Sequence, residues 1–256
     1  MDYCEIIPLT GEQLVTISEN RVINMSVTSE GVEKPVSKAT YSATSTTAKP
    51  VASMFKTTSQ MRKFFIRFYN AFYKTLLMFF DKVIPERVIA EINLVATPFT
   101  PTPAQQIYTS PNIYDAIIQM ISSLVKLGYK PNIAKISIAS MAALQTMRAS
   151  DGHYMLKNNG SINILDSTIT FGNLIIKLDT DTSFADDDVL VADLTAVKIG
   201  LDNDVAYYEA YVDNDFKTNK KSHLVEKYLA VNIPTALRSG VIKDNLTNVK
   251  TLITKV

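Results

Sequence analysis

The sequence "GVEKPVSKATYSATSTTAKPVASMFKTTSQM", residues 31–61, is followed by the helix-like run "RKFFIRFYNAFYKTLLMFFDKVIPERV" at residues 62–88, and these two segments have the clearest structural patterns in the chain. Between Ser37 and Ser59, 11 of 23 residues are Ser or Thr, and large apolar side chains are almost absent. Thr, Tyr and Val favour strands, while Gly31 and Pro35 punctuate the segment as the end of a hairpin does. A two-stranded arm is marginal alone in water. We therefore expect it to lie on another surface, most simply that of a neighbouring subunit.

The run after the arm has helical spacing. Its apolar stripe steps by four or three residues through Met61, Phe65, Phe68, Phe72, Leu76, Phe79 and Val83, and a polar stripe follows through Lys63, Arg67, Asn70, Lys74 and Asp81. A membrane-spanning helix would carry Arg67 and Lys74 through the hydrocarbon at about 2.5 to 3.5 kcal/mol each. The pattern predicts an amphipathic helix outside the membrane. Pro85 is expected to end it and to open a second helix.

The rest of the chain mixes helices and short strands. After the linker "TPFTPTPAQQIYTS" (residues 97–110), Ser110 is a candidate N-cap with Pro111 in the first turn. One apolar face then runs to Gly128 through Ile113, Ile117, Ile118, Ile121, Leu124 and Val125. "AKISIAS" (134–140) alternates as a strand, and Ser140 is a candidate cap for a short helix. The last long run, "HLVEKYLAVNI" (223–233), reads as a central strand, so we predict an α+β fold.

Composition excludes several classes of protein. The 256 residues are 46% hydrophobic and 20% charged, which is typical of a folded chain, and the net charge is only +1. A chain with nearly equal numbers of basic and acidic residues lacks the positive electrostatic potential with which non-specific nucleic-acid-binding proteins attract phosphates. Cys4 is the single cysteine, so an intrachain disulfide is impossible and a reducing compartment fits. The N-terminus has neither a basic nor an apolar region typical of a secretory signal.

Motifs for catalysis and for cofactors are absent from the sequence. The eight glycines form no phosphate-binding loop, there is no GxSxG elbow, and His153 and His223 are far apart. Asp179, Asp181 and Ser183 match the first ligand positions of a calcium loop. The match then fails, because Phe184 stands where the loop needs Gly and Leu190 where it needs Glu. We therefore expect no metal and no cofactor.

The cluster Asp151, His153 and Tyr154 raises the question of a catalytic site. Asp151-Gly152 follows a helix whose apolar pattern stops at Met147, which favours a turn with Gly in a positive φ conformation. A general base would need a partner that orients it, and the sequence offers none. We predict a turn at these residues.

Three segments resemble tailed-phage major capsid proteins of the Hong Kong 97 type. "ALQTMRASDGHYML" (143–156) resembles the family's short helix and turn, residues 31–61 resemble its extended loop leading into the spine helix, and "ITFGNLIIKLDT" (169–180) is similar to its turn and strand. The resemblance covers roughly residues 22 to 250 in the family's order. Each motif alone is a turn or an amphipathic pattern, so the ordered combination carries the resemblance.

The resemblance implies a Hong Kong 97-type capsid fold with an extended β-hairpin loop, a long spine helix, a peripheral domain and an axial domain. It places an N-terminal arm at residues 1–21, the extended loop at 22–60 and the spine helix with its linker in the peripheral domain at 61–110. The axial domain follows at 111–221, and the return strand with the C-terminal part of the peripheral domain at 222–256. The start of the arm within about two dozen residues of Met1 departs from relatives that carry a long N-terminal scaffolding segment.

The implied function is self-assembly into an icosahedral shell in the bacterial cytoplasm, as the major capsid protein of a virion. The partners are other copies of the chain in pentamers and hexamers, with a separate scaffolding protein, a portal and decoration proteins as further candidates. The near-zero net charge fits a wall that encloses DNA without binding it tightly.

Some relatives join their subunits by an isopeptide bond between a Lys of the extended loop and an Asn of a neighbour, with a Glu nearby. Matched onto this sequence, Lys34 takes the place of the Lys, Asn219 that of the Asn and Glu226 that of the Glu. A buried Glu could remove the proton that keeps Lys non-nucleophilic. The alternative is that Lys34 is a solvated charge at a hairpin tip and Asn219 a loop residue.

Other interpretations stay open at this level. An encapsulin-like bacterial compartment has the same fold and packages a protein cargo, and a prophage remnant keeps the fold without assembling. An enzyme with an unrecognised site belongs to a different class. A deep pocket lined by convergent polar groups would favour it.

Overall fold

The structure is a computed structural model of the chain. It describes residues 4–9, 11–22, 27, 28, 30, 33–64, 66–106, 108–148, 162, 163, 167–181 and 183–255. The described residues form two compact units by their contacts. The first comprises Tyr3–Glu91 and Lys198–Ala236, and the second comprises Ile92–Val197 and Leu237–Val256.

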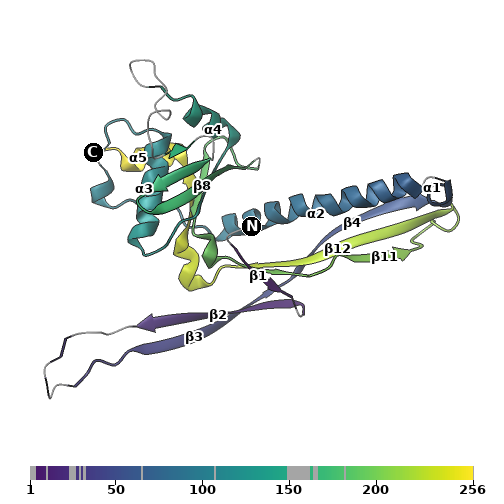
Figure 1. Cartoon of the computed structure of the whole chain (residues 1–256), viewed down its shortest axis with the longest axis horizontal. Helices are drawn as coiled ribbons and strands as arrows, with labels where there is room; N and C mark the ends of the chain where they lie inside the picture. The colour runs from purple at the N-terminus through teal and green to yellow at the C-terminus, as the bar shows by residue number, and fades with distance from the viewer. Residues whose placement is uncertain are drawn as a thin grey trace. The chain divides into compact units, whose positions relative to one another are not determined.

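The first unit is built around one long strand. β12 (Lys220–Asn232) pairs antiparallel with β4 (Lys49–Thr58) on one edge and with β10 (Lys198–Leu201) and β11 (Ala206–Ala210) on the other, and β1 (Glu5–Pro8) extends the sheet by pairing parallel with β10. β12 is therefore central, as the sequence predicts. A separate two-stranded ribbon is formed by β2 (Gln13–Val22) and β3 (Lys38–Thr47), which lie side by side in Figure 1. We call this ribbon the hairpin.

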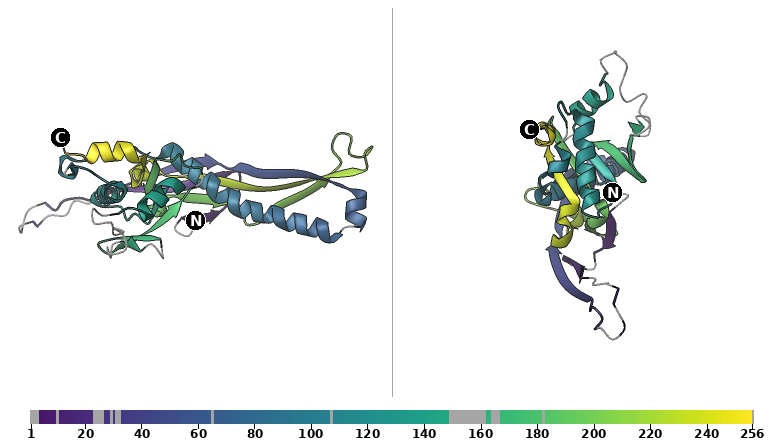
Figure 2. Two further views of the ribbon diagram at one scale, coloured as in Figure 1. Left: turned by 90° about the horizontal axis from the view of Figure 1, so that it is seen from above. Right: turned by 90° about the vertical axis from the view of Figure 1, so that its left-hand side faces the viewer.

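A short helix α1 (Ser59–Phe64) leads into the long helix α2 (Ile66–Val95), which runs along the sheet in Figure 1 and in the left view of Figure 2. The buried positions of α2 recur every four residues at Leu76, Phe80, Ile84 and Val88. The polar stripe predicted from the sequence is confirmed as exposed. Phe79, however, was placed on the apolar stripe and is 55% exposed, because the buried row follows i, i+4 steps that leave it to one side.

Pro85 does not end the helix, contrary to the sequence-based expectation, since α2 continues through it to Val95. Proline removes one backbone donor and its ring presses on the carbonyl four residues earlier, here that of Asp81. Asp81 is exposed, so water can satisfy that carbonyl, while Ile84 and Val88 on either side are buried. Packing along the helix therefore outweighs the local cost of the proline.

The second unit holds a six-stranded mixed sheet in the order β13-β9-β5-β8-β7-β6. Its strands are β5 (Ile133–Ile136), β6 (Ile162–Asn163), β7 (Thr168–Phe171), β8 (Leu174–Thr180), β9 (Asp188–Ala192) and β13 (Val241–Asn245). Its helices are α3 (Ile113–Lys126), α4 (Ile138–Gln145) and α5 (Leu246–Ile253), with 3-10 turns at Pro103–Gln105 and Leu194–Ala196. A further 3-10 turn, Thr235–Gly240, contains the point in the sequence where the chain passes from the first unit to the second.

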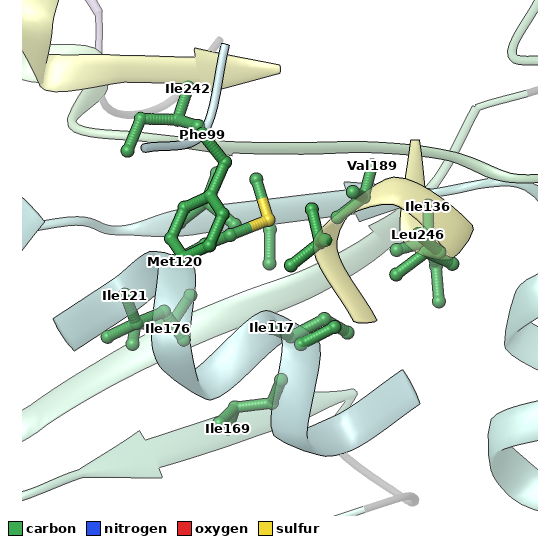
Figure 3. Close-up of a cluster of buried hydrophobic side chains, with 14 of the residues drawn as sticks. Phe99, Ile117, Met120, Ile121, Ile136, Ile169, Ile176, Val189, Ile242 and Leu246 are labelled. Atoms are coloured by element: carbon green, nitrogen blue, oxygen red, sulfur yellow. The ribbon is translucent and has the colours of Figure 1, made fainter. Parts of the chain in front are cut away.

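The core of the second unit lies between α3, α5 and the sheet. Ile117, Met120 and Ile121 of α3 meet Ile176 of β8 and Leu246 of α5, all fully or almost fully buried (Figure 3). The apolar face predicted for residues 113–125 is thus the core-facing side, except at Val125, which is exposed. Both strands and helices fill this core, which confirms the predicted α+β class.

Two helix starts differ from the expected ones. The N-cap of α3 is Asn112 and not Ser110, because Asn112 and Asp115 form a capping box, each side chain accepting from the other's backbone N–H at 2.9 Å. The N-cap of α4 is Ser137 and not Ser140, whose N–H donates to the Ser137 hydroxyl at 3.0 Å. In both cases the N-cap side chain accepts from the backbone N–H three positions on, which fixes the start of the helix.

The limits of the two units follow from long-range strand pairing, and the domain ranges expected from the resemblance stay a prediction. β10 and β11 pair with β12 and so belong to the first unit. Residues 237–256 belong to the second, since β13 pairs with β9. Long-range strand pairing decides both limits, which no local signal in the sequence marks. Among the described residues, no helix is long and apolar enough to cross a membrane.

Candidate assembly surface

The hairpin has one apolar face that no described residue of its own unit covers. Because side chains directly opposite in antiparallel strands share a face, the register Val15 with Ser45, Ile17 with Ala43 and Glu19 with Tyr41 places these residues together. Val15, Ile17 and Tyr41 are 58%, 72% and 68% exposed. We call this side the outer face of the hairpin. β2 supplies Val15 and Ile17 to this face, in addition to Tyr41 from the Ser/Thr-rich segment 37–59.

The other face holds the base of the hairpin against the first unit. Leu14 packs with Ala48 and Ala230 in a small buried cluster, and the Asn232 amide donates to the Thr16 hydroxyl. Gly200 favours this close approach, since a Cβ there would stand only 3.2 Å from the Cβ of Leu14. The base thus fixes which way the hairpin faces, and its outer face points away from its own sheet.

At the other end of β12, the loop of residues 211–219 is fixed by a buried carboxylate. Asp215 is 3% exposed and accepts from the Lys56 ammonium at 2.8 Å, the Ser222 hydroxyl at 2.5 Å and the Val212 backbone N–H at 3.1 Å. The hydrogen bond from Lys56, followed by that from Ser222, lowers the pKa of Asp215 to about 2. The loop is therefore tied to β4 through an ionised group.

His223, one of two histidines considered in the sequence, is fully buried next to this loop. Its ring nitrogens hydrogen-bond the hydroxyls of Thr57 on β4 and Tyr207 on β11, each at 2.6 Å, and its ring stacks on Phe55 at 4.7 Å between centroids. The residue joins three strands and so has a structural role. A signal existed in the sequence, because a polar residue in a central strand has to find hydrogen-bond partners on the neighbouring strands.

The three residues of the predicted cross-link lie apart in one chain. Lys34 and Asn219 are exposed, and Glu226 is half-buried on β12. Asn219 takes a positive φ of 55°, and its side-chain oxygen accepts from the Ser59 hydroxyl at 2.7 Å. Six steps of strand from Lys220 to Glu226 span roughly 20 Å. One chain therefore cannot supply Asn219 and Glu226 to the same reaction.

Asp179 and Asp181, which match the first ligand positions of a calcium loop, form ion pairs within the second unit. Burial raises the pKa of Asp181, but hydrogen bonds from Ser183 and the charge of Lys135 outweigh this and hold that pKa below its usual value. Lys135 lies 3.4 Å from Asp181 and 3.8 Å from Asp179, so the carboxylates already have a cation. The parts of the chain that are described contain no group of residues that could hold a metal ion. Asp151, His153 and Tyr154 lie outside the described residues.

Neither a protein-family model nor a curated protein matches the sequence. Solved structures do match. A chain of Microbacterium phage Oxtober96 is 14% identical with a TM-score of 0.67, over 95% of this chain and 89% of that one. A chain of Gordonia phage Cozz is 12% identical with a TM-score of 0.63, over 95% and 84%. A chain of the capsid of an empty GTA particle, computed with C5 symmetry, is 10% identical with a TM-score of 0.62, over 94% and 87%.

The chain has the Hong Kong 97-type capsid fold. The match extends over about 95% of its length, so both units and the long helix belong to the shared fold. The fold predicted from three ordered motifs is thereby confirmed, although at these identities the sequences retain little in common.

Proposed function

We propose that the protein is a major capsid protein that assembles through copies of itself into an icosahedral shell enclosing DNA, and that it is a component of a virion. The observation that carries this is the hairpin, whose apolar outer face its own base turns away from the sheet. Apolar side chains left in water favour association, and in a chain of this fold the available partner is another copy. The capsid fold and the C5 symmetry of the GTA structure support pentamers as one assembly form.

In this proposal the first unit acts as the peripheral domain with the hairpin as extended loop, and the second unit acts as the axial domain. Hexamers, a scaffolding protein, a portal and decoration proteins complete the expected assembly. The net charge of +1 is consistent with a shell that encloses DNA without binding its phosphates tightly.

The proposed cross-link joins Lys34 of one copy to Asn219 of another. The Lys34 Nζ attacks the Asn219 Cγ, the new amide bond forms, and the Asn Nδ2 leaves as ammonia while a proton passes to Glu226. The Ser59 hydroxyl supports this chemistry, because its hydrogen bond to the Asn219 Oδ1 would stabilise negative charge on that oxygen. Glu226 has to come from a copy other than the one that supplies Asn219, given its separation from Asn219 along β12.

Assembly is tested by size-exclusion chromatography at several concentrations together with negative-stain electron microscopy. Rings of five or six subunits, or closed shells, are expected. A protein that stays monomeric at every concentration contradicts the proposal. An encapsulin-like compartment is distinguished by content, since shells isolated from cells would then hold a protein cargo and no nuclease-protected DNA.

A further inference from the structure

His223 connects three strands of the first unit from the middle of its sheet. The strand register places it directly opposite Glu209 of β11 on one side and Phe55 of β4 on the other, and its side chain is fully buried. An imidazole in water takes up a proton at about pH 6.5, so a buried histidine that links strands is suited to a pH-sensitive contact. The hydrogen bonds that the neutral and the charged ring can make decide whether this histidine forms one.

The hydrogen bonds around His223 have a direction that begins at Glu209. A carboxylate only accepts, so the Tyr207 hydroxyl donates to the Glu209 Oε1 at 3.2 Å. The one proton of that hydroxyl is then in use, and its oxygen accepts from the His223 Nδ1–H at 2.6 Å. The Nε2 of the neutral ring remains as an acceptor, and the Thr57 hydroxyl donates to it at 2.6 Å. With a neutral ring in the Nδ1–H tautomer, each N–H and O–H of this series therefore has an acceptor.

A second proton on His223 would disrupt the series at Thr57. The charged ring carries an N–H on both nitrogens, so the Nε2–H and the Thr57 O–H would meet in the same 2.6 Å contact. Thr57 is 2% exposed, and within the described part of the chain its hydroxyl has no hydrogen-bond partner other than His223. The hydroxyl would have to turn away and leave its proton without an acceptor in a buried site. The burial of a charged ring adds to this cost.

The charged groups that face His223 largely offset one another. The Glu209 Oε1 lies 3.4 Å from the His223 Nδ1, and this proximity favours a charged ring. Glu209 already forms an ion pair with Lys221 through its other oxygen, however, and the Lys221 ammonium would repel a second cation. From β4, Phe55 stacks on the ring and Thr57 bonds it, and neither carries a charge.

Other ionisable side chains described near this series do not favour a charged ring either. From α2, Tyr73 packs edge-on against the Tyr207 ring at 5.5 Å between centroids. The Asp215 carboxylate bonds Lys56 and Ser222, and Ser222 precedes the histidine along β12, so it points to the opposite face of the strand. The surroundings of the ring as a whole therefore favour the neutral imidazole.

We propose that His223 is the centre of a pH-sensitive latch, in which the neutral imidazole fastens β4 and β11 to β12 and its protonation loosens them. The latch comprises Glu209, Tyr207, His223 and Thr57. All four residues belong to one copy, so the inference goes beyond the proposed function and does not depend on assembly.

The pH range of the latch follows from the unfolded chain. There the histidine takes up a proton at about pH 6.5, whereas the closed latch has no place for that proton. Stability is therefore present above about pH 6.5 and decreases below it, and the folding equilibrium constant shifts by up to about tenfold per pH unit. This range is separate from that of Asp215, because the pKa of that carboxyl group is about 2.

A protein with one histidine tests the latch directly. His153→Gln leaves His223 as the only histidine in the chain. Nitrogen-15 NMR of the ring, in solution or with magic-angle spinning for assembled protein, distinguishes the two neutral tautomers and the charged form. The Nδ1–H tautomer is expected at pH 7.5, and the ring of the folded protein is expected to remain neutral at pH 6. A charged ring at pH 7, or the Nε2–H tautomer, overturns the inference.

Denaturant unfolding between pH 7.5 and 5 measures the stability that the latch controls. In the His153→Gln protein the folding equilibrium constant is expected to fall by about tenfold or more between pH 6.5 and 5. Adding His223→Gln, which keeps one donor and one acceptor but does not titrate, is expected to remove most of this fall. Adding Thr57→Ser instead keeps the hydroxyl and is the matched control, expected to retain the fall. The same fall with and without His223→Gln overturns the inference.

Hydrogen exchange locates the part of the chain that loosens. Between pH 7.5 and 5.5, after correction for the intrinsic exchange rates, the amides of β11 are expected to lose protection while those of β5 and β9 in the second unit keep theirs. Equal loss in both units, or no loss in β11, contradicts the latch. The ring NMR decides the inference even if His223→Gln does not fold.

Discussion

Single residues fix the end of the first unit where β4 runs into α1. Lys56 bonds Asp215, Thr57 bonds His223 and Ser59 bonds Asn219, so consecutive parts of β4 and α1 are tied to β12 and its loop. Asp215 matters most for the stability of this end. A buried carboxylate that loses its hydrogen-bond and ion-pair partners costs far more folding free energy than an exposed charge does. We therefore expect the stability of this end to depend on the ionisation of Asp215.

Asp215→Asn tests this dependence. The pKa of Asp215 is depressed from 3.8 to about 2 in the folded protein, so its contribution to stability is present above pH 4 and is lost as the pH falls toward 2. The variant should be less stable than the wild type at pH 7 and should show a weaker pH dependence between 4 and 2. Denaturant unfolding across this range measures both.

Asp213→Asn is the control, because Asp213 is exposed, lies in the same loop and approaches Lys56 only to 4.0 Å. It should leave the stability and its pH dependence almost unchanged. Equal pH profiles for wild type and Asp215→Asn would show that the buried carboxylate does not couple to folding.

At the scale of elements, α2 shows how packing overrides a local rule. The helix has 30 residues and contains Pro85, and its buried residues continue at the same spacing on both sides of the proline. Leu76, Phe80, Ile84 and Val88 bury one face against the sheet, and each fully buried large apolar side chain contributes about 1.5 to 3 kcal/mol. The proline costs about 3 kcal/mol in a helix interior, which the sum of these contributions exceeds.

Pro85→Ala is therefore expected to raise the free energy of unfolding by about 1 to 2 kcal/mol, because it restores a backbone donor and a good helix former. Chemical unfolding monitored by circular dichroism measures the change. Glu86→Ala, an exposed neighbour on the same helix, is expected to change it by less than about 0.5 kcal/mol. A loss of stability in Pro85→Ala would show that the sheet requires the bend or the ring of the proline.

At the scale of the whole molecule, each unit is built from separate stretches of the chain. The first unit is made from the N-terminal part and from residues 198–236, and the second from residues 92–197 and 237–256. Neither unit is a continuous segment, so neither is expected to fold from a simple truncation. The hairpin belongs to the first unit, which therefore carries the proposed contacts between copies.

Assembled shells also test the proposed covalent bond. If Lys34 of one copy joins Asn219 of another, denaturing gels of mature shells should show a ladder of higher bands, and each joined peptide pair should have lost the mass of one ammonia. Lys34→Arg should abolish the ladder without preventing assembly, and Lys38→Arg, an exposed lysine on β3, should keep it. A single unshifted band from wild-type shells would remove Lys34, Asn219 and Glu226 from consideration as a cross-link.

Local patterns in the sequence determined several features of this protein. The polar stripe and much of the amphipathic character of α2, the buried face of α3, the central strand at 223–233 and the existence of an extended arm all follow from period and composition within one segment. Such features need only neighbours a few residues apart, which is the range over which periodicity and propensity act.

The tertiary structure decided the rest. Only the pairing of β2 with β3 reveals the outer face, because Ile17 comes from a segment that the sequence assigned to an N-terminal arm ending at residue 21. The Asp215 and His223 clusters join segments more than 150 residues apart. These features depend on contacts distant in the sequence. The pattern of one segment cannot specify which other segment will lie beside it, and only the folded chain brings those side chains together.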